Sequence, residues 1–203
     1  MQFISFIQFL DFFGSFVFAL SGAIVASRKG MDILGMLVLA VVTAVGGGTL
    51  RSILIGDAPV PFLKDYLYLT VCILAVLIVF YFKRFLLKIG KPMIFCDAIG
   101  LGIFVSIGIS VALDKGLSPW ASLLMGVITG SFGGVIRDVL SNEIPLIFQK
   151  EIYATACLIG GGLFLVLRQL NAPEEIIVYI SAFTVFGVRL IAVKLGLSLP
   201  RSK

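Results

Sequence analysis

The chain contains two related stretches, Val45-Gly46-Gly47-Gly48-Thr49-Leu50-Arg51-Ser52 and Ser131-Phe132-Gly133-Gly134-Val135-Ile136-Arg137-Asp138. Each lies late in a long apolar run, and in each an arginine follows three residues after the last glycine. A glycine inside a helix costs roughly 1 kcal/mol relative to alanine. An arginine at the centre of a membrane-spanning helix costs about 2.5–3.5 kcal/mol. Two such costs at matched positions indicate a polar pathway through the molecule.

The composition indicates a membrane protein. Of the 203 residues, 60% are hydrophobic and 13% are charged, and the mean hydropathy is +1.14. About a quarter of the residues in an ordinary soluble domain are charged. We therefore expect an all-α integral membrane protein that has lipid as a partner.

The residue types also exclude several kinds of chemistry. The chain has no histidine, which excludes histidine metal ligands, Ser-His-Asp catalysis and histidine proton relays. Cys72, Cys96 and Cys157 stand apart from one another without a CxxC pair, so they predict packing residues. No nucleophile–base pair, Walker loop, HExxH motif or carboxylate pair at acid–base spacing is present. We expect no enzyme, no cofactor, and no metal beyond transient monovalent cations.

Seven apolar segments have lengths near the roughly 17–25 residues that cross a bilayer. They cover residues 6–27, 33–55, 66–82, 98–113, 119–140, 152–167 and 176–193. Ser118-Pro119 predicts the start of the fifth segment, because serine suits an N-cap and proline a first helical turn. A basic linker, residues 83–91, separates the third segment from the fourth.

The two halves of the chain form an internal repeat. Shifting the sequence by 86 residues aligns 11–64 with 97–150 without a gap, and 18 of these 54 positions are identical. Shared apolar composition does not explain identical pairs such as Asp11/Asp97, Arg51/Arg137 and Pro59/Pro145. Each unit holds three spans, and because three is odd the second unit is expected to be inverted.

We therefore expect one membrane domain over 1–203 with seven transmembrane helices. The first three-helix repeat is assigned to 6–82, the second, inverted repeat to 97–167, and the seventh helix to 176–195. The predicted loops and ends on one side of the membrane carry three basic residues, namely Lys64, Lys115 and Arg168. Those on the other side carry ten: Arg28, Lys29, Lys83, Arg84, Lys88, Lys91, Lys150, Lys194, Arg201 and Lys203.

Cytoplasmic loops carry an excess of lysine and arginine, so we expect the N-terminus outside and the C-terminus in the cytoplasm. The net charge of +5 follows from this topology and predicts no nucleic-acid partner. The N-terminus lacks a basic n-region, so no cleaved signal peptide is expected. The short chain favours the plasma (inner) membrane of a prokaryote.

The glycine clusters Gly46–Gly48 and Gly133–Gly134 have two interpretations. Small residues let transmembrane backbones approach closely, and this interpretation is preferred for Gly160–Gly162, which no arginine follows. Alternatively, the glycines break the second and fifth helices and free backbone groups to line a watery path. Thr43 and Thr129 lie one turn before the glycines; their hydroxyls either line that path or bond to the preceding carbonyls.

The charged residues in the spans also have alternatives. Arg51 and Arg137 either snorkel to the interface or meet near the centre through the repeat symmetry. Asp138 adjoins Arg137 without a necessary pairing, since adjacent helical residues diverge by about 100°, and Arg51 is expected to find its counter-ion at Asp11, Asp57 or water. Asp11 and Asp97 are interpreted as helix-start carboxylates, with a buried role open for Asp11. Arg189 and Lys194 are interpreted as cations at a helix end.

These motifs resemble the prokaryotic relatives of the trimeric intracellular cation (TRIC) channels. The resemblance rests on three plus three spans and a seventh, on GGGTLR and GGVIRD, and on the ending from Arg189 to Pro200. It implies a homotrimer with a pore in each protomer, lined by broken second and fifth helices and conducting K⁺ and Na⁺. By motif position it implicates Gly46, Gly47, Gly48 and Arg51 in one half, and Gly133, Gly134, Arg137 and Asp138 in the other. Ser52 and Phe132 depart from strict symmetry.

The same sequence group includes proteins named glycine transporters, so two functions stand. In a cation channel, carbonyls and hydroxyls would replace the hydration water of the ion, and the arginines would have to be neutralised. In a transporter of a small zwitterion such as glycine, an arginine would bind the substrate carboxylate. A purely structural membrane protein is the third alternative, and the paired buried charges argue against it.

Overall fold

The computed structural model describes residues 2–88, 91–149 and 152–197, and within these ranges every regular element is helical. Lys150, Pro200, Arg201 and Lys203, which contribute to the predictions above, lie outside the described residues. The helices are α1 (Gln2–Arg28), α2 (Ile33–Ile55), α3 (Pro61–Lys64), α4 (Leu67–Lys88), α5 (Pro92–Asp114), α6 (Pro119–Leu140), α7 (Ala154–Gln169) and α8 (Glu174–Leu195), with a 3-10 turn, η1, at Leu146–Phe148.

The chain is thus an all-helical membrane protein, as its composition predicted. Among the described residues, six helices are long and apolar enough to cross a bilayer, namely α1, α2, α4, α5, α6 and α8. The predicted sixth span corresponds to α7, which has 16 residues and falls short of the usual crossing length. A count of seven crossings therefore stays a prediction.

The helix ends follow from local sequence. Asp32 caps α2 by accepting a hydrogen bond from the Gly35 backbone N–H at 2.7 Å. Gly56 ends α2 in the left-handed conformation that glycine adopts freely. Ser118 precedes α6 as predicted, although its side chain makes no capping bond. The predicted linker after residue 82 is largely helical: α4 continues to Lys88 and departs from helical geometry at Phe82.

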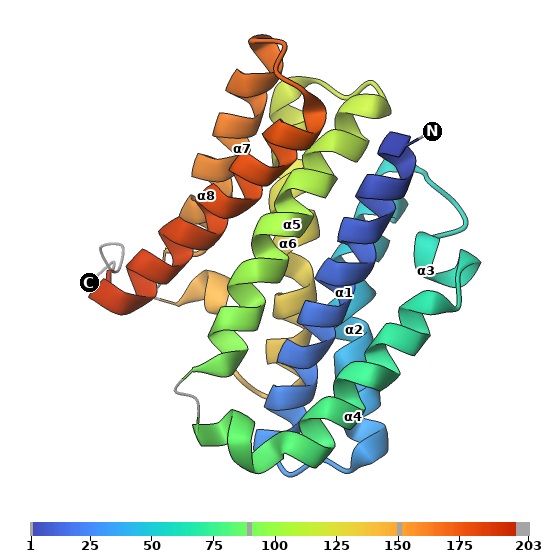
Figure 1. Ribbon diagram of the computed structural model, residues 1–203, viewed down its shortest axis with the longest axis vertical. Helices are drawn as coiled ribbons and strands as arrows, with labels where there is room; N and C mark the ends of the chain where they lie inside the picture. The colour runs from blue at the N-terminus through green and yellow to red at the C-terminus, as the bar shows by residue number, and fades with distance from the viewer. Residues whose placement is uncertain (1, 89–90, 150–151, 198–203) are drawn as a thin grey trace.

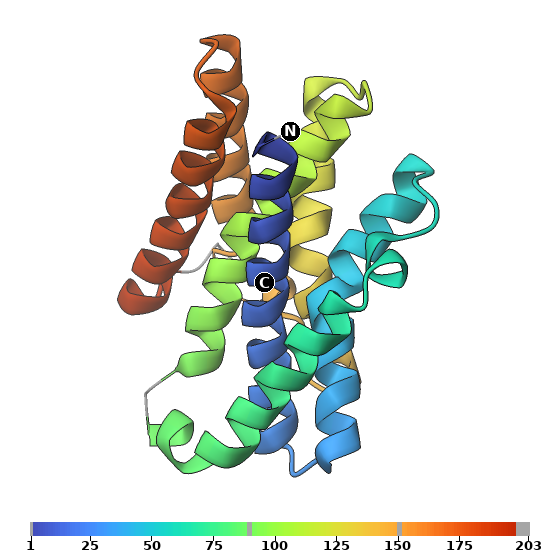
Figure 2. The same ribbon diagram turned by 45° about the vertical axis from the view of Figure 1, so that its right-hand side comes forward.

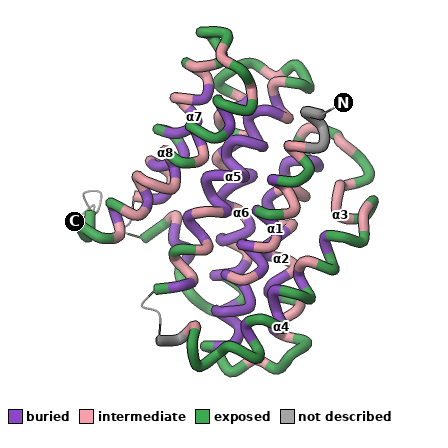
Figure 3. The backbone as a smooth tube through the Cα atoms, viewed as in Figure 1, coloured by how far each residue is buried: buried purple, intermediate pink, exposed green. Residues whose placement is uncertain are grey.

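The two most buried helices, α1 and α5, form the centre of the bundle. Buried residues make up 72% of the apolar window of α5 and 67% of that of α1, against 22% in α4 (Figure 3). Around them, α2 and α4 pack on α1, while α6, α7 and α8 pack on α5 (Figures 1 and 2). Helices α2 and α6 also contact each other, which joins the two halves of the chain.

The glycine clusters form the crossing of α2 and α6. A β-carbon at Gly47 would overlap the Thr129 carbonyl oxygen, and one at Gly133 would overlap the Thr43 carbonyl oxygen. The 86-residue shift relates these two contacts to each other. Both helices run continuously through their glycines, so the prediction of broken second and fifth helices is wrong. The glycines allow close packing instead.

The third glycine cluster packs as predicted at two of its positions. A β-carbon at Gly160 would meet Val185, and one at Gly161 would meet Leu123. Gly162 faces open space.

Candidate functional site

Arg137 on α6 lies at the centre of a buried polar network, in which its Nη2 and Oδ2 of Asp97 have no hydrogen-bond partner among the described residues. Its side chain is fully buried. Nη1 lies 2.7 Å from Asp97 Oδ1, and Nε lies 2.8 Å from Asp138 Oδ1. Nη1 also donates to Ser21 Oγ on α1, and the backbone N–H of Leu146 donates to Asp138 Oδ2 at 3.0 Å. One buried cation thus faces two carboxylates, and the adjacent Arg137 and Asp138 do pair, contrary to the expected divergence.

Two further large side chains adjoin this network. The Arg189 guanidinium carbon on α8 lies 4.8 Å from the centre of the Tyr153 ring, a distance suited to a cation–π contact. Arg189 is fully buried and lies six residues before the end of α8. Its interpretation as a cation at a helix end is therefore wrong. Tyr153 and Ser21 were not identified from the sequence, because no local pattern marks a partner that packing brings from another helix.

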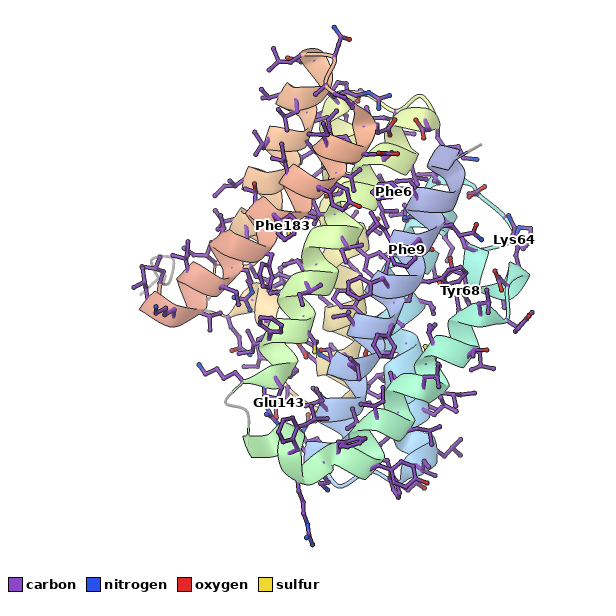
Figure 4. All side chains as sticks on the ribbon, in the orientation of Figure 1. Phe6, Phe9, Lys64, Tyr68, Glu143 and Phe183 are labelled. Carbon is purple, nitrogen blue, oxygen red and sulfur yellow. The ribbon has the colours of Figure 1, made fainter. Side chains whose placement is uncertain are left out.

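Arg51 on α2 is also buried, with 5% of its surface exposed, but its surroundings differ. Its Nε and Nη1 atoms are buried and have no hydrogen-bond partner among the described residues. Asp11, Tyr68 and Asp57 interact with it electrostatically. Tyr68 lies at the start of α4 (labelled in Figure 4), and its hydroxyl donates a hydrogen bond to Asp11. Both arginines are thus inside the protein, and the snorkelling alternative is wrong.

The two aspartates do not begin helices. Asp11 lies well inside α1 and is partly buried, and Asp97 lies in the second turn of α5 and is fully buried. Their interpretation as helix-start carboxylates is wrong, whereas a buried role for Asp11 was an open alternative. Thr43 Oγ1 donates to the Leu39 carbonyl at 2.5 Å, and Thr129 Oγ1 to the Met125 carbonyl at 2.6 Å. These hydroxyls therefore bond to the preceding turn.

Cavities open beside both arginine sites. A cavity of about 410 Å³ is lined by Arg51, Asp11, Asp57 and Asp114. A narrow space of about 20 Å³ lies between Arg51, Asp11 and Tyr68, and it has room for one water molecule. The Arg51 side chain therefore lies beside cavities that are large enough for water and are lined by carboxylates.

A second large cavity, of about 390 Å³, is lined by Asp138, Arg28, Lys29 and Glu143, among other residues. Its lining residues come from the ends of α1 and α6, whereas those of the Arg51 cavity include the ends of α2 and α5. Figure 1 shows that these two pairs of helix ends lie at opposite ends of the bundle. The two cavities therefore approach the buried arginines from opposite ends of the molecule.

Each cavity has an ion pair in or beside its wall. Lys115 Nζ lies 3.1 Å from Asp57 Oδ1 at the Arg51 cavity, and Lys29 pairs with Glu143 at the other (Figure 4 shows Glu143). The 86-residue shift aligns Lys29 with Lys115 and Asp57 with Glu143. Each ion pair therefore joins the first half of the chain to the second.

Sequence and structure comparisons identify the family. A family model described as glycine transporter matches residues 8–84 and 94–169. The chain belongs to this family. It is 44% identical to a UPF0126 membrane protein of Vibrio cholerae, over 97% of this chain and 82% of the relative. It is 40% identical to the UPF0126 inner membrane protein YadS of Escherichia coli, over 96% of this chain and 95% of the relative.

Solved structures with a similar fold include TRIC channels. A structure described in work on conductance through TRIC cation channels matches with a TM-score of 0.87 and 41% identity, over 97% of both chains. The TRIC channel orthologue of Rhodobacter sphaeroides matches with a TM-score of 0.90 and 37% identity, over 95% of this chain and 100% of that one. The fold of this family member is therefore that of prokaryotic TRIC channels, as its motifs indicated.

Proposed function

We propose that the protein is a channel for monovalent cations, K⁺ and Na⁺, with a pathway in each protomer of a homotrimer. Support from outside the chain comes from its structural neighbours, which are TRIC cation channels. Within the chain, the proposal depends on one observation: two cavities reach toward buried charges from opposite ends. The pathway runs between these cavities, past the crossing of α2 and α6.

The charges near the pathway suit a cation at most points. Arg137 is neutralised by Asp97 and Asp138, so it presents no net repulsion. The cavity beside Arg51 carries the carboxylates of Asp11, Asp57 and Asp114. Arg51 is then the main electrostatic barrier, because two of its nitrogens face no acceptor among the described residues. A cation would pass when the Arg51 side chain turns aside toward Asp11, Asp57 or a water molecule, and not while it lies across the pathway.

The proposed pathway assigns roles to the predicted site residues. Arg51 and Asp11 line the opening, Ser52 is buried next to Arg51 in the chain, and Arg137, Asp138 and Asp97 form a fixed charged cluster. Gly48 faces Arg51 and Gly134 faces Asp97 and Tyr153, whereas Gly46, Gly47 and Gly133, with Thr43 and Thr129, set the distance between α2 and α6. These residues act by packing rather than by exposing carbonyl oxygens.

The repeat and its orientation belong to the same proposal. We assign 6–82 and 97–167 to inverted three-helix units and 176–195 to a seventh helix within the single domain 1–203. The matched contacts of Gly47 with Thr129 and of Gly133 with Thr43 support this symmetry. The protein would lie in the inner membrane of a bacterium, with the N-terminus outside and the C-terminus in the cytoplasm, as the distribution of basic residues predicts.

Transport of a small zwitterion such as glycine is the second candidate. It is favoured by the Arg51 cavity, which combines unpaired guanidinium nitrogens with several carboxylates. A substrate carboxylate would bind Arg51 and its ammonium group would face Asp11 or Asp114. The description of the family model agrees with this candidate.

Reconstitution separates the two candidates. Currents across a planar bilayer in a KCl gradient are measured beside uptake of labelled glycine into proteoliposomes. Discrete ohmic openings that reverse near the potassium equilibrium potential are expected for the channel. Saturable glycine uptake without unitary currents would reject the channel and support the transporter.

A further inference from the structure

The two arginine sites are related by the repeat but differ in two partners. Arg137 donates to Asp138 through Nε and to Ser21 through Nη1. The 86-residue shift places Ser52 at the position of Asp138 and Ile107 at the position of Ser21. The first half therefore keeps the arginine and loses both of these acceptors. The atoms left unpaired on Arg51 are Nε and Nη1, the same two that Arg137 uses.

The backbone around the two sites is alike, so the difference lies in the side chains. The Asp57 N–H donates to the Ser52 carbonyl at 2.8 Å, and the Glu143 N–H donates to the Asp138 carbonyl at 2.9 Å. Further along, the Leu63 N–H donates to the Val60 carbonyl at 3.0 Å, and its repeat equivalent, Gln149, donates to Leu146 at 3.1 Å. An aspartate in place of Ser52 would therefore start from the same backbone geometry as Asp138.

Ser52 does not replace the missing acceptor. Its side chain is fully buried, and its hydroxyl has no hydrogen-bond partner among the described residues. Buried donors without a partner are unfavourable, and Arg51 borders both the 410 Å³ cavity and the narrow space of about 20 Å³. Water or an oxygen atom of a passing solute can supply the bonds that the protein omits.

We propose that Ser52 is a positioning residue that keeps Arg51 mobile, whereas Asp138 immobilises Arg137. Arg51, in the first half of the chain, then controls the pathway alone, whereas Arg137, in the second half, stays fixed. This inference rests on the proposed function, because it assigns the control of the pathway to one of two symmetric arginines.

The test restores the missing carboxylate. Ser52→Asp should hold Arg51 across the pathway and lower K⁺ flux from proteoliposomes about tenfold or more, since a buried charge-assisted bond is strong enough for such a change. Ser52→Asn should lower the flux less, and Ser52→Ala is the reference for both variants, because it adds no acceptor and the native hydroxyl has no partner among the described residues. Adding Arg51→Ala to Ser52→Asp should abolish the reduction.

A second readout does not depend on flux. A dicarbonyl reagent that modifies arginine should label Arg51 in the wild type, and mass spectrometry of peptides should find this label reduced in Ser52→Asp. Arg137 should stay unlabelled in both proteins. If the wild type conducts no K⁺ but the labelling contrast is found, the proposed function fails and the inference about Ser52 survives.

Other outcomes would overturn the inference. Unchanged flux and unchanged labelling in a folded Ser52→Asp protein would show that the added carboxylate does not fix Arg51. A rise in flux would show that the charge at this position matters and the mobility of Arg51 does not. If Ser52→Asp fails to fold, Ser52→Asn is compared with Ser52→Ala instead. The same K⁺ flux and the same Arg51 labelling in these two variants would reject a positioning role for Ser52.

Discussion

At the residue scale, a buried arginine is stabilised when nearby acceptors, carboxylates above all, compensate its charge. Arg137 meets this condition through Asp97, Asp138 and Ser21. Removing one member of a buried ion pair leaves an uncompensated charge and commonly costs about 3–5 kcal/mol. The Arg137 network is therefore expected to support folding, whereas Arg51 is held by fewer bonds and is available for function.

Arg137→Ala should strongly reduce the amount of folded protein, because it leaves Asp97 and Asp138 buried without a cation. We expect a loss of about 3–5 kcal/mol in unfolding free energy, measured as a lower midpoint of thermal unfolding in detergent. Arg137→Ala with Asp97→Asn and Asp138→Asn is the matched control and should recover part of the stability. An Arg137→Ala protein that is as stable as the wild type would contradict the structural role of the network.

The sequence predicted which charged residues matter better than it predicted their partners. The repeat identified Arg51 and Arg137 as equivalent, and the loss of a carboxylate at Ser52 was visible in the alignment. Asp97 lies 40 positions from Arg137 and Ser21 lies 116 positions away. Such pairings depend on how helices pack, and no periodicity in one segment encodes them.

At the element scale, hydropathy located the helices but missed some of their ends. The second span, 33–55, and the fifth, 119–140, agree with α2 and α6. Helix α5 begins at Pro92, six residues before the predicted start, because proline at a first turn and the apolar residues after it extend the helix. The expected break at the glycines did not occur, since neighbouring backbone fills the space where side chains would lie.

Gly47→Val should separate α2 from α6, because its β-carbon would overlap the Thr129 carbonyl oxygen. We expect a loss of about 1–3 kcal/mol of stability from overpacking, measured by thermal unfolding, together with altered flux. Gly162→Ala is the control, since its β-carbon would enter open space and alanine favours a helix by roughly 1 kcal/mol. Equal stability of Gly47→Val and Gly162→Ala would contradict the close crossing.

At the scale of the whole molecule, the two halves are joined by equivalent contacts at opposite ends. Lys29–Glu143 and Lys115–Asp57 bridge the halves beside the two cavities, while the α2–α6 crossing joins them in the middle. Such exposed ion pairs contribute about 0–1 kcal/mol each. They are weak enough to break when a cavity widens.

Charge reversal tests the bridge between Lys29 and Glu143. Glu143→Lys should leave stability within about 1 kcal/mol of the wild type and should increase the access of a membrane-impermeant thiol reagent to a cysteine introduced at Val25. The double variant Lys29→Glu with Glu143→Lys should restore the wild-type rate. An access rate that is the same in all three proteins would show that this ion pair does not control its cavity.

The proposed role of Arg51 as the electrostatic barrier on a cation pathway is decided by K⁺ flux through Arg51→Ala in proteoliposomes. Removing this positive charge from the pathway should raise K⁺ flux about tenfold relative to the wild type, while the thermal unfolding midpoint changes little. A folded Arg51→Ala protein whose K⁺ flux equals that of the wild type would contradict this role.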